Sequence, residues 1–447
     1  MNFRNLACFV VVIELLASVL SLTPVRAAGP ELAADDAKVI WCPIKVLLPR
    51  SSKDGCTPAF DTMSQFLGEL ARRNPATAGT VWIGKYYDSS PDDFIVFDGA
   101  TLKRMANYPL NIKGGWNGLK TGSVDLTTPS IFDGASFTVQ RWKANITVRN
   151  LQIKNATVGA GCDPFNGNSS SVALCISTVG KISLDRVQGQ GAFLSNSIPS
   201  SYTWPPLIVT NSQFSNSLGN GLYIDSDETV TLTNVQAYDN ARNGTEVNGN
   251  YTFVKVFLKG TNTFLNNGSA GLRVETMGSI SANNLMAYDN GTAGVYIDNS
   301  HNGGGPSTMV SPVKVTGAML KGNGANGLEV WATGSITAKN ITATSNANGL
   351  SLSSTAATDT LAISLSNVNA DLNTYSGSVL YADGKVSVAC SSMYGNGAWG
   401  LFLRGATNTM GPAAALKLQG FQSLMNFYAP VDVLTTTPLV LTPTCPS

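Results

Sequence analysis

The sequence predicts an all-β solenoid, a parallel β-helix with a short N-terminal capping helix. Three observations lead to this fold: a repeat of about 23 residues, apolar residues at alternate positions within each repeat, and Asn or Gly at fixed points between them. Alternation with a period of two indicates strands that bury one face. Asn and Gly tolerate the left-handed backbone conformation that a sharp bend requires. Coils of this kind stack about 4.8 Å apart, so equivalent residues form ladders.

The composition fits a folded solenoid and argues against several other classes. Charged residues make up 13% of the 447 residues, which is about half of the usual share of about 25%. Hydrophobic residues reach 43%, enough to bury a core, so a charge-rich disordered chain is excluded. Because 29 basic residues face 28 acidic ones, no strongly basic surface is available and no nucleic-acid partner is expected.

The first 27 residues have the pattern of a secretory signal peptide. Arg4 precedes an apolar run over residues 6–22, and Val25-Arg26-Ala27 forms a small-residue cleavage site. No later stretch holds about 18 uninterrupted apolar residues, so we expect no transmembrane segment after cleavage. The sequence therefore predicts an exported protein, secreted or held at the cell surface.

Six cysteines remain after the signal peptide, an even number that is typical of disulfides in an exported chain. Zinc is the competing interpretation, but the sequence has no CxxC pair and His301 is its only histidine. The six allow 15 pairings, of which we favour two local loops and one bond that fixes the C-terminus: Cys42–Cys56, Cys162–Cys175 and Cys390–Cys445.

A capping helix is predicted before the repeats, within an N-terminal cap over residues 28–79. Residues 60–73 place apolar side chains at helical spacing and two arginines in the last turn. A cap is needed because a terminal coil would otherwise expose unpaired backbone groups and apolar side chains. Residues 80–83 then read as a first strand.

One pattern recurs along the chain: two apolar residues at alternate positions, a marker residue two positions later, and an Asn six residues after the marker. Buried Asn in such a ladder could bond backbone groups at the bends, whereas exposed Asn would only occupy turns; both remain open. The whole pattern occurs at the markers Asn234, Gly260, Asn284, Gly317, Asn340, Asn367 and Cys390, with the later residues Asn240, Asn266, Asn290, Asn323, Asn346, Asn373 and Asn396. Upstream, the markers Asn150, Arg186 and Asn211 match its first half.

A second pattern, Gly-apolar-x-apolar, follows these Asn residues and predicts another strand in each coil. It begins at Gly221, Gly244, Gly271, Gly294, Gly327, Gly349 and Gly400. A leucine-rich repeat would need an L-x-x-L-x-L frame that is absent, and a β-sandwich would not keep a six-residue Asn spacing. We therefore predict a β-helix over residues 80–410 and a C-terminal cap over residues 411–447.

This coil pattern resembles the right-handed parallel β-helix proteins that are grouped with pectate lyases, over roughly residues 80–410. The stretch 107–118, Asn-Tyr-Pro-Leu-Asn-Ile-Lys-Gly-Gly-Trp-Asn-Gly, is similar to the opening segment of secreted bacterial surface β-helix proteins. The resemblance implies a right-handed solenoid. It also implies one of two kinds of function, since many members are polysaccharide lyases, hydrolases or epimerases and others are adhesin-like surface proteins.

The outward positions of the Gly-apolar-x-apolar strands gather charged and aromatic residues in a chain that is poor in charge. Aromatic faces and carboxylates suit sugars, which present apolar C–H faces and hydroxyl edges. We therefore predict a saccharide-binding stripe formed by Tyr223, Asp225, Tyr296, Glu329 and Trp331.

Catalysis on the same stripe is the alternative, with Arg273, Glu275, Asp298 and Glu246 as the candidate catalytic residues. A lyase would need a base, Arg273 or Tyr296, and Ca²⁺ could be held by oxygen ligands from Asp225, Glu246, Glu275 and Asp298. A hydrolase would need two carboxylates about 5–9 Å apart, such as Glu246–Glu275 or Glu275–Asp298. His301, in a Gly-rich insertion, is interpreted as exposed.

These observations favour an exported β-helix protein that contacts a polysaccharide or cell-surface glycan without cleaving it. A polysaccharide lyase or glycoside hydrolase acting on acidic polysaccharide is the second hypothesis. A structural envelope protein, whose outward charges only keep the surface solvated, is the third.

Overall fold

The computed structural model describes residues 39–49, 52–89, 94–118, 124–156, 172–196, 205–249, 253–300, 310–356, 360–406, 413, 415–435, 440–442 and 444–445. Residues 36–447 form one compact unit. The predicted signal peptide, residues 1–27, lies outside the described residues. Among the described residues, no helix has both the length and the apolar character needed to cross a membrane.

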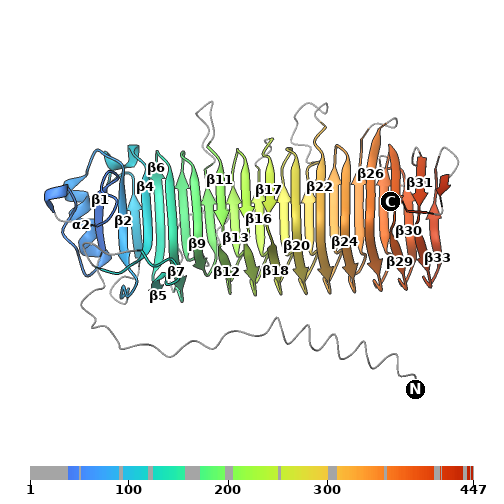
Figure 1. The fold of residues 1–447 in the computed structure, drawn as a ribbon, viewed down its shortest axis with the longest axis horizontal. Helices are drawn as coiled ribbons and strands as arrows, with labels where there is room; N and C mark the ends of the chain where they lie inside the picture. Colours follow the sequence, from blue (N-terminus) through green and yellow to red (C-terminus); the bar gives the residue numbers. More distant parts are fainter. Residues whose placement is uncertain are drawn as a thin grey trace, which may run out of the picture. The chain divides into compact units, whose positions relative to one another are not determined.

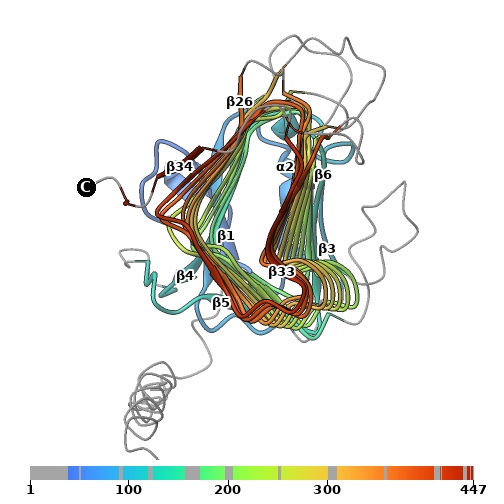
Figure 2. The ribbon, with the colours of Figure 1, turned by 90° about the vertical axis from the view of Figure 1, so that its right-hand side faces the viewer.

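Two long sheets, made almost entirely of parallel strands, wrap around a common interior (Figures 1 and 2). The first sheet consists of β1 (Val39–Pro43), β2 (Gly79–Gly84), β4 (Leu110–Trp116), β5 (Ser130–Asp133), β7 (Ile146–Lys154), β9 (Ile182–Gly189), β11 (Leu207–Thr210), β12 (Gln213–Ser215), β14 (Val230–Thr233), β15 (Gln236–Tyr238), β17 (Val256–Lys259), β18 (Asn262–Leu265), β20 (Ile280–Tyr288), β22 (Val313–Lys321), β24 (Ile336–Thr344), β26 (Leu361–Asp371), β28 (Lys385–Ala389), β29 (Ser392–Tyr394), β31 (Ala415–Gln419), β32 (Gln422–Leu424) and β34 (Val440–Thr442).

The second sheet takes one strand from each coil, in register with the strand of the coil before. It consists of β3 (Phe94–Asp98), β6 (Ser136–Trp142), β8 (Leu174–Thr178), β10 (Ala192–Ser195), β13 (Leu222–Asp225), β16 (Thr245–Asn248), β19 (Leu272–Glu275), β21 (Val295–Asp298), β23 (Leu328–Ala332), β25 (Leu350–Ser354), β27 (Ser378–Ala382), β30 (Trp399–Arg404) and β33 (Ala429–Val433). The predicted parallel β-helix is confirmed.

The marker residues of the first repeat pattern bend the first sheet. All ten adopt the left-handed conformation, with φ between 48° and 71°. Asn and Gly accept this conformation at little energetic cost, which explains why they hold most of the marker positions. In Figure 2 the first sheet turns through this bend along the whole stack.

The Asn residues that follow the markers form a buried ladder, which decides between the two alternatives left open by the sequence. The Nδ2 of Asn290 donates hydrogen bonds to the Oδ1 of Asn323, at a distance of 2.9 Å, and to the carbonyl oxygen of Phe264, at 3.2 Å. The Asn267 backbone N–H donates to the Oδ1 of Asn290 over 3.1 Å. Since each Asn bonds the coils on both sides, the ladder satisfies polar groups that the interior would otherwise leave unpaired.

One coil departs from the predicted spacing of six. After the marker Gly260, the buried Asn of the ladder comes seven residues later instead of six. It is Asn267, which is 1% exposed. The predicted member, Asn266, instead occupies an exposed left-handed corner with φ 56°. An Asn-Asn pair satisfies both positions, which is why the sequence pattern alone assigned the wrong one.

The glycines of the second pattern have a different role from the one expected for a corner. Gly271 is not among the positive-φ residues, so it does not supply a left-handed bend. A Cβ atom there would lie 2.6 Å from the carbonyl oxygen of Gly294 and 2.8 Å from the Nδ2 of Asn290. The repeated glycine therefore permits close stacking of each coil on the next.

The N-terminal end is closed by a strand and a helix. Strand β1 pairs with β2 in antiparallel register, an element that the sequence analysis did not predict. The predicted helix is confirmed as α2 (Met63–Arg73), although it begins after Phe60, at the N-cap Thr62. Its residues Met63, Phe66 and Leu70 are fully buried against the first coils.

Two of the three predicted disulfides are confirmed. Cys42 bonds to Cys56 within the N-terminal cap, and Cys390 bonds to Cys445. Cys175 is also disulfide-bonded, and its predicted partner Cys162 lies outside the described residues. Parallel pairing continues into the segment predicted as the C-terminal cap, where β31 pairs with β34 and β30 with β33.

Candidate functional site

The outward side chains of the second sheet form two parallel columns, as the alternation of its strands requires. We call the outward residues of β13, β16, β19, β21 and β23 the outer ladder. One column contains Tyr223, Glu246, Arg273, Tyr296 and Glu329, and the other contains Asp225, Asn248, Glu275, Asp298 and Trp331. All of the site residues predicted from the sequence therefore lie on one face, although not around one point.

Arg273 is the centre of contacts in this ladder. Its guanidinium is paired with the carboxylate of Glu275 on its own strand, and its Nε lies 3.8 Å from the Oε1 of Glu246 on the preceding strand. Its Cζ also lies 4.9 Å from the ring centroid of Tyr296 on the following strand. Arg273 thus holds three neighbouring coils together through charge and a cation–π contact.

These surroundings place both candidate bases in their protonated forms. Burial alone would lower the pKa of Arg273, but the carboxylates of Glu275 and Glu246 outweigh it and raise that pKa above its ordinary value. Burial, reinforced by Asp298, raises the pKa of Tyr296 to about 12. A general base works best when its pKa is near the working pH, so neither residue has the properties of a base at neutral pH.

Asparagines next to the strands orient two carboxylates of the outer ladder. The Oε2 of Glu246 accepts hydrogen bonds from the Nδ2 of Asn220 and of Asn243, both over 2.8 Å. The Oε2 of Glu329 accepts one from the Nδ2 of Asn326, also over 2.8 Å. The sequence analysis missed these residues, although each stands directly before a repeat glycine and an Asn-Gly pair could have indicated them.

Trp331 is the most exposed large ring of the outer ladder. Trp331 is 42% exposed, and its Nε1 donates a hydrogen bond to the Oε1 of Glu329 at a distance of 3.0 Å. Glu329 is therefore held from two sides, and the indole is anchored at its polar edge. This arrangement leaves an apolar ring surface beside a fixed carboxylate.

The N-terminal end of the ladder continues into an aromatic pair. The rings of Phe193, on β10, and Tyr223 are stacked, with centroids 5.4 Å apart and planes 8° from parallel. The adjoining Ser195 hydroxyl donates to the Oδ2 of Asp225 over 3.4 Å. The sequence analysis did not include β10, because it lies upstream of the clear Gly-apolar-x-apolar repeats.

Asp298 is fixed by the residues that follow it. Its Oδ1 accepts hydrogen bonds from the Ser300 backbone N–H over 2.8 Å and from the Ser300 hydroxyl over 2.7 Å. Asp298 pairs in register with Glu275 on the preceding coil. His301, which the sequence placed in a Gly-rich insertion, lies outside the described residues.

The four carboxylates predicted as calcium ligands do not gather at one point. Asp225, Glu275 and Asp298 lie in one column, with Asn248 standing between the first two, and Glu246 lies in the other column. In the described part of the chain, no three His, Cys, Asp or Glu side chains come close enough to hold a metal ion. Of the two predicted hydrolase pairs, Glu275–Asp298 shares a column, whereas Arg273 contacts both members of Glu246–Glu275.

Beyond β23 the same face becomes polar and then aromatic. Ser351 and Ser353 continue the two columns on β25, and Val379 and Tyr381 follow on β27. The sequence analysis passed over β27 because Ser378 replaces the apolar residue that should follow the glycine.

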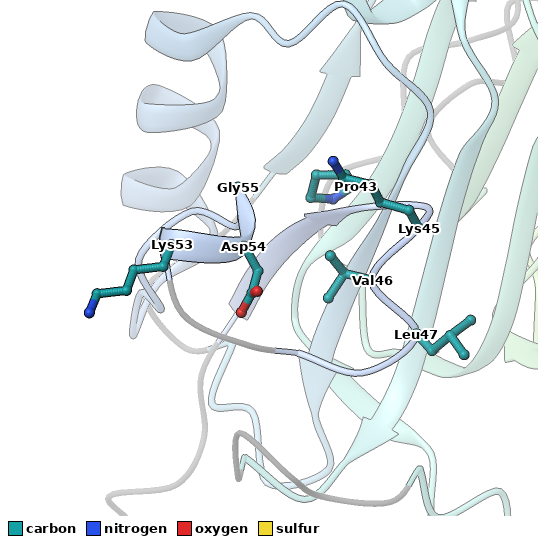
Figure 3. A pocket seen from close by; sticks show the side chains of 7 residues that line it. All are labelled: Pro43, Lys45, Val46, Leu47, Lys53, Asp54 and Gly55. Carbon is teal, nitrogen blue, oxygen red and sulfur yellow. The ribbon is translucent and has the colours of Figure 1, made fainter.

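A separate concave surface lies in the N-terminal cap (Figure 3). It has a volume of about 650 Å³ and is lined by Pro43, Lys45, Val46, Leu47, Lys53, Asp54 and Gly55. Pro43 ends β1, the next three lining residues follow it in the loop, and the last three lie in or directly after the short 3₁₀ helix η2 (Ser52–Asp54). Its described lining residues include neither an aromatic ring nor a pair of carboxylates, so they do not share the chemistry of the outer ladder.

Comparison with known proteins identifies the fold. Residues 198–362 match the family model described as a right handed beta helix region. A search of curated proteins found no match. The similar solved structures include the A-module of the mannuronan C-5 epimerase AlgE4 of Azotobacter vinelandii, with 12% identity, coverage of 83% of this chain and 93% of that one, and a TM-score of 0.47.

Two further solved structures are similar at the same low level of identity. The first is the periplasmic alginate epimerase AlgG, with 12% identity, coverage of 93% of this chain and 95% of that one, and a TM-score of 0.39. The second is the surface adhesin PfbA of Streptococcus pneumoniae, with 13% identity, coverage of 82% of this chain and 88% of that one, and a TM-score of 0.34. At these values the likeness concerns the fold alone. Residues 198–362 thus match a right-handed β-helix region, and the described residues of the chain fold as a parallel β-helix.

Proposed function

We propose that this exported β-helix protein binds a polysaccharide or cell-surface glycan along the outer ladder and does not cleave it. The observation that carries the proposal is the combination of exposed ring surface and oriented carboxylates on one rigid parallel sheet. Sugar rings pack their C–H faces on aromatic rings while carboxylates accept hydrogen bonds from their hydroxyls. The stacked strands would present these groups to successive units of an extended chain.

The carboxylates of the ladder are oriented before any ligand arrives. Asn220 and Asn243 hold Glu246, Asn326 and Trp331 hold Glu329, and Ser300 holds Asp298. Side chains that are already fixed lose little conformational entropy when a ligand binds, which favours affinity. Tightly fixed acceptors on a sheet therefore support a recognition surface.

The protonation of the candidate bases argues for binding over cleavage. Tyr296 has its pKa raised to about 12, and Arg273 is paired with Glu275 and lies near Glu246. Proton abstraction beside a uronate carboxylate would need a base that is free at neutral pH. Glycoside hydrolysis through Glu275 and Asp298, which share a column, is the second candidate function.

Export is supported by the disulfides. Cys42–Cys56 and Cys390–Cys445 form in oxidising compartments, which lie outside the cytoplasm. The predicted signal peptide over residues 1–27 points the same way. A secreted or surface location would expose the outer ladder to extracellular polymers.

Affinity electrophoresis in gels that contain single polysaccharides tests this proposal. The wild-type chain should be retarded by at least one neutral or acidic polymer, and Trp331→Ala should weaken that retention by about tenfold, since the most exposed ring of the outer ladder is lost. Phe257→Ala removes an outward ring from β17 on the first sheet and should leave the retention unchanged. If Trp331→Ala and Phe257→Ala behave alike, the outer ladder is not the binding surface.

A further inference from the structure

We propose that the first sheet carries a second binding surface, which holds an anionic polysaccharide along a line of lysines. The surface is the outward side of the part of each coil that precedes the bend, from β14 to β31. Its lysines, which we call the basic face, are Lys259, Lys314, Lys339, Lys385 and Lys417. The inference does not depend on the proposed function, because the outer ladder belongs to the other sheet.

Charge is divided between the two sheets. The strands of the basic face contain lysines but no Asp or Glu; they are β14, β17, β28, β31 and the parts of β20, β22, β24 and β26 before the bend. The outer ladder has the opposite character, with five carboxylates and Arg273 as its one cation. The two sheets lie on different sides of the interior (Figure 2). The nearly equal totals of 29 basic and 28 acidic residues therefore conceal a basic surface that the composition did not lead us to expect.

Hydroxyl-bearing residues stand between the lysines along the stack. Ser281 pairs in register with Lys314, and Lys314 with Thr337. In the neighbouring column Thr316 pairs with Lys339. A strand spacing of about 4.8 Å and a rise of about 3.3 Å per residue put Lys314 and Lys339, which are diagonal neighbours, about 8 Å apart at their Cα atoms. The face thus presents ammonium groups with hydroxyl groups between them.

The lysines of the basic face are not neutralised by carboxylates of the described residues. All five are exposed. In the described part of the chain, Lys154 is the one lysine in an ion pair, with Asp133. Glu228 and Asp383, in the turns before β14 and β28, accept hydrogen bonds from backbone N–H groups. Like charges on one face repel one another, and a ligand of opposite charge relieves that repulsion.

The basic face forms a straight track along the stack (Figure 1). Lys259 on β17 and Lys417 on β31 are separated by six coil steps of continuous parallel pairing, which is about 29 Å at about 4.8 Å per step. Acidic residues return beyond the bend, at Asp289 and Asp371, so the track is only as wide as the part of each coil before the bend. A narrow line of cations of this length matches an extended polyanion.

The chemistry of the face favours a polysaccharide over a nucleic acid. Bases of a single strand would need aromatic rings on which to stack. Phe257 is the one ring among the outward residues of these strands, and the ammonium of Lys259 lies over it, 5.6 Å from its centroid. The strands contain no Arg, the residue that binds phosphate oxygens in pairs. Lysines among Ser and Thr hydroxyls instead suit the separate carboxylates and hydroxyls of an acidic polysaccharide.

Binding of the full chain to immobilised polygalacturonate at low ionic strength tests the proposal. The wild type should bind, and added salt should weaken the binding because exposed charges are screened. The triple variant Lys259→Gln/Lys314→Gln/Lys339→Gln removes the central cations of the track while keeping long polar side chains. Its affinity for polygalacturonate should fall by at least about tenfold, since charge attraction holds the polymer.

A second triple variant, Lys53→Gln/Lys103→Gln/Lys143→Gln, is the matched control. These three lysines are exposed and lie outside the strands of the first sheet, so the variant loses the same net charge elsewhere. It should bind polygalacturonate like the wild type. Trp331→Ala alters only the outer ladder and should also leave this binding unchanged. These expectations hold even if the outer ladder is found to bind no polymer.

Four results would contradict the proposal. The first is a wild type that does not bind polygalacturonate, and the second is an equal loss in both triple variants, which would mean that only net charge matters. The third is a loss on Trp331→Ala with none in the basic-face variant, since the polymer would then lie on the outer ladder. The fourth is tighter binding to single-stranded DNA or to vesicles with an anionic lipid, which would overturn the choice of a polysaccharide.

Discussion

At the scale of single residues, the repeated Gly and Asn are explained by how closely neighbouring coils stack. The repeat glycines from Gly221 to Gly327 each face the carbonyl oxygen of the next repeat glycine, as Gly271 faces Gly294. The buried Asn ladder then bonds the backbone at the same level. These two residue types leave room for a parallel stack and satisfy its polar groups.

Gly271→Ala tests this steric account. The new Cβ would lie 2.6 Å from a backbone oxygen that cannot move alone, so we expect a loss of about 1–3 kcal/mol in the free energy of unfolding. Gly68 in α2 is the matched control, because a Cβ there meets nothing within 4 Å. Gly68→Ala should stabilise the protein by about 0.5–1 kcal/mol. Denaturant unfolding of both variants should give opposite signs, and equal signs would count against the account.

The residues that sequence reasoning placed correctly are those with a strong local preference. Left-handed corners favour Asn and Gly, so Asn234 and Gly260 could be recognised from the pattern. Which Asn joins the buried ladder cannot be recognised in this way, because it depends on the coils that are stacked on either side. Asn266 and Asn267 are locally equivalent, and only the stacked structure distinguishes the exposed one from the buried one.

At the scale of elements, the N-terminal cap is a small assembly of a helix, a strand and a disulfide loop. Glu69 of α2 accepts hydrogen bonds from Arg72 and Arg73, and Arg73 donates from Nη1 to the carbonyl oxygen of Cys56 over 3.0 Å. The helix is therefore tied to the loop that the Cys42–Cys56 disulfide closes. Its apolar spacing could be seen in the sequence, whereas β1 is buried at all five positions and so shows no alternation.

The ion pairs of Glu69 predict a pH dependence for this cap. Hydrogen bonds from Arg72 and then Arg73 lower the pKa of Glu69 from 4.5 to about 2. A carboxyl whose folded-state pKa is lowered adds stability above its unfolded pKa and loses it as the pH falls through the folded value. Melting temperatures from pH 7 to pH 2 should thus show wild type above Glu69→Gln at neutral pH. The difference should fade below about pH 4.5, and a difference that is independent of pH would contradict this assignment.

At the scale of the whole molecule, the stack turns separate repeats into one continuous surface. Alternation within each strand was enough to predict which residues face outward, and parallel register aligns them into two columns. Alternation could not reveal that Arg273 pairs with Glu275 and lies near Glu246, or that asparagines from the preceding turns orient the carboxylates. Those contacts depend on rotamers and on neighbouring coils, which a single repeat does not specify.

A single incubation tests the central claim most directly. The purified chain is mixed with the polysaccharide that retards it, and bound polymer and newly released reducing or unsaturated sugar ends are measured in the same sample. We predict retained polymer without released ends, and no change in released ends for Arg273→Ala. Released ends that depend on Arg273, or the absence of retention on every polymer tested, would contradict the account.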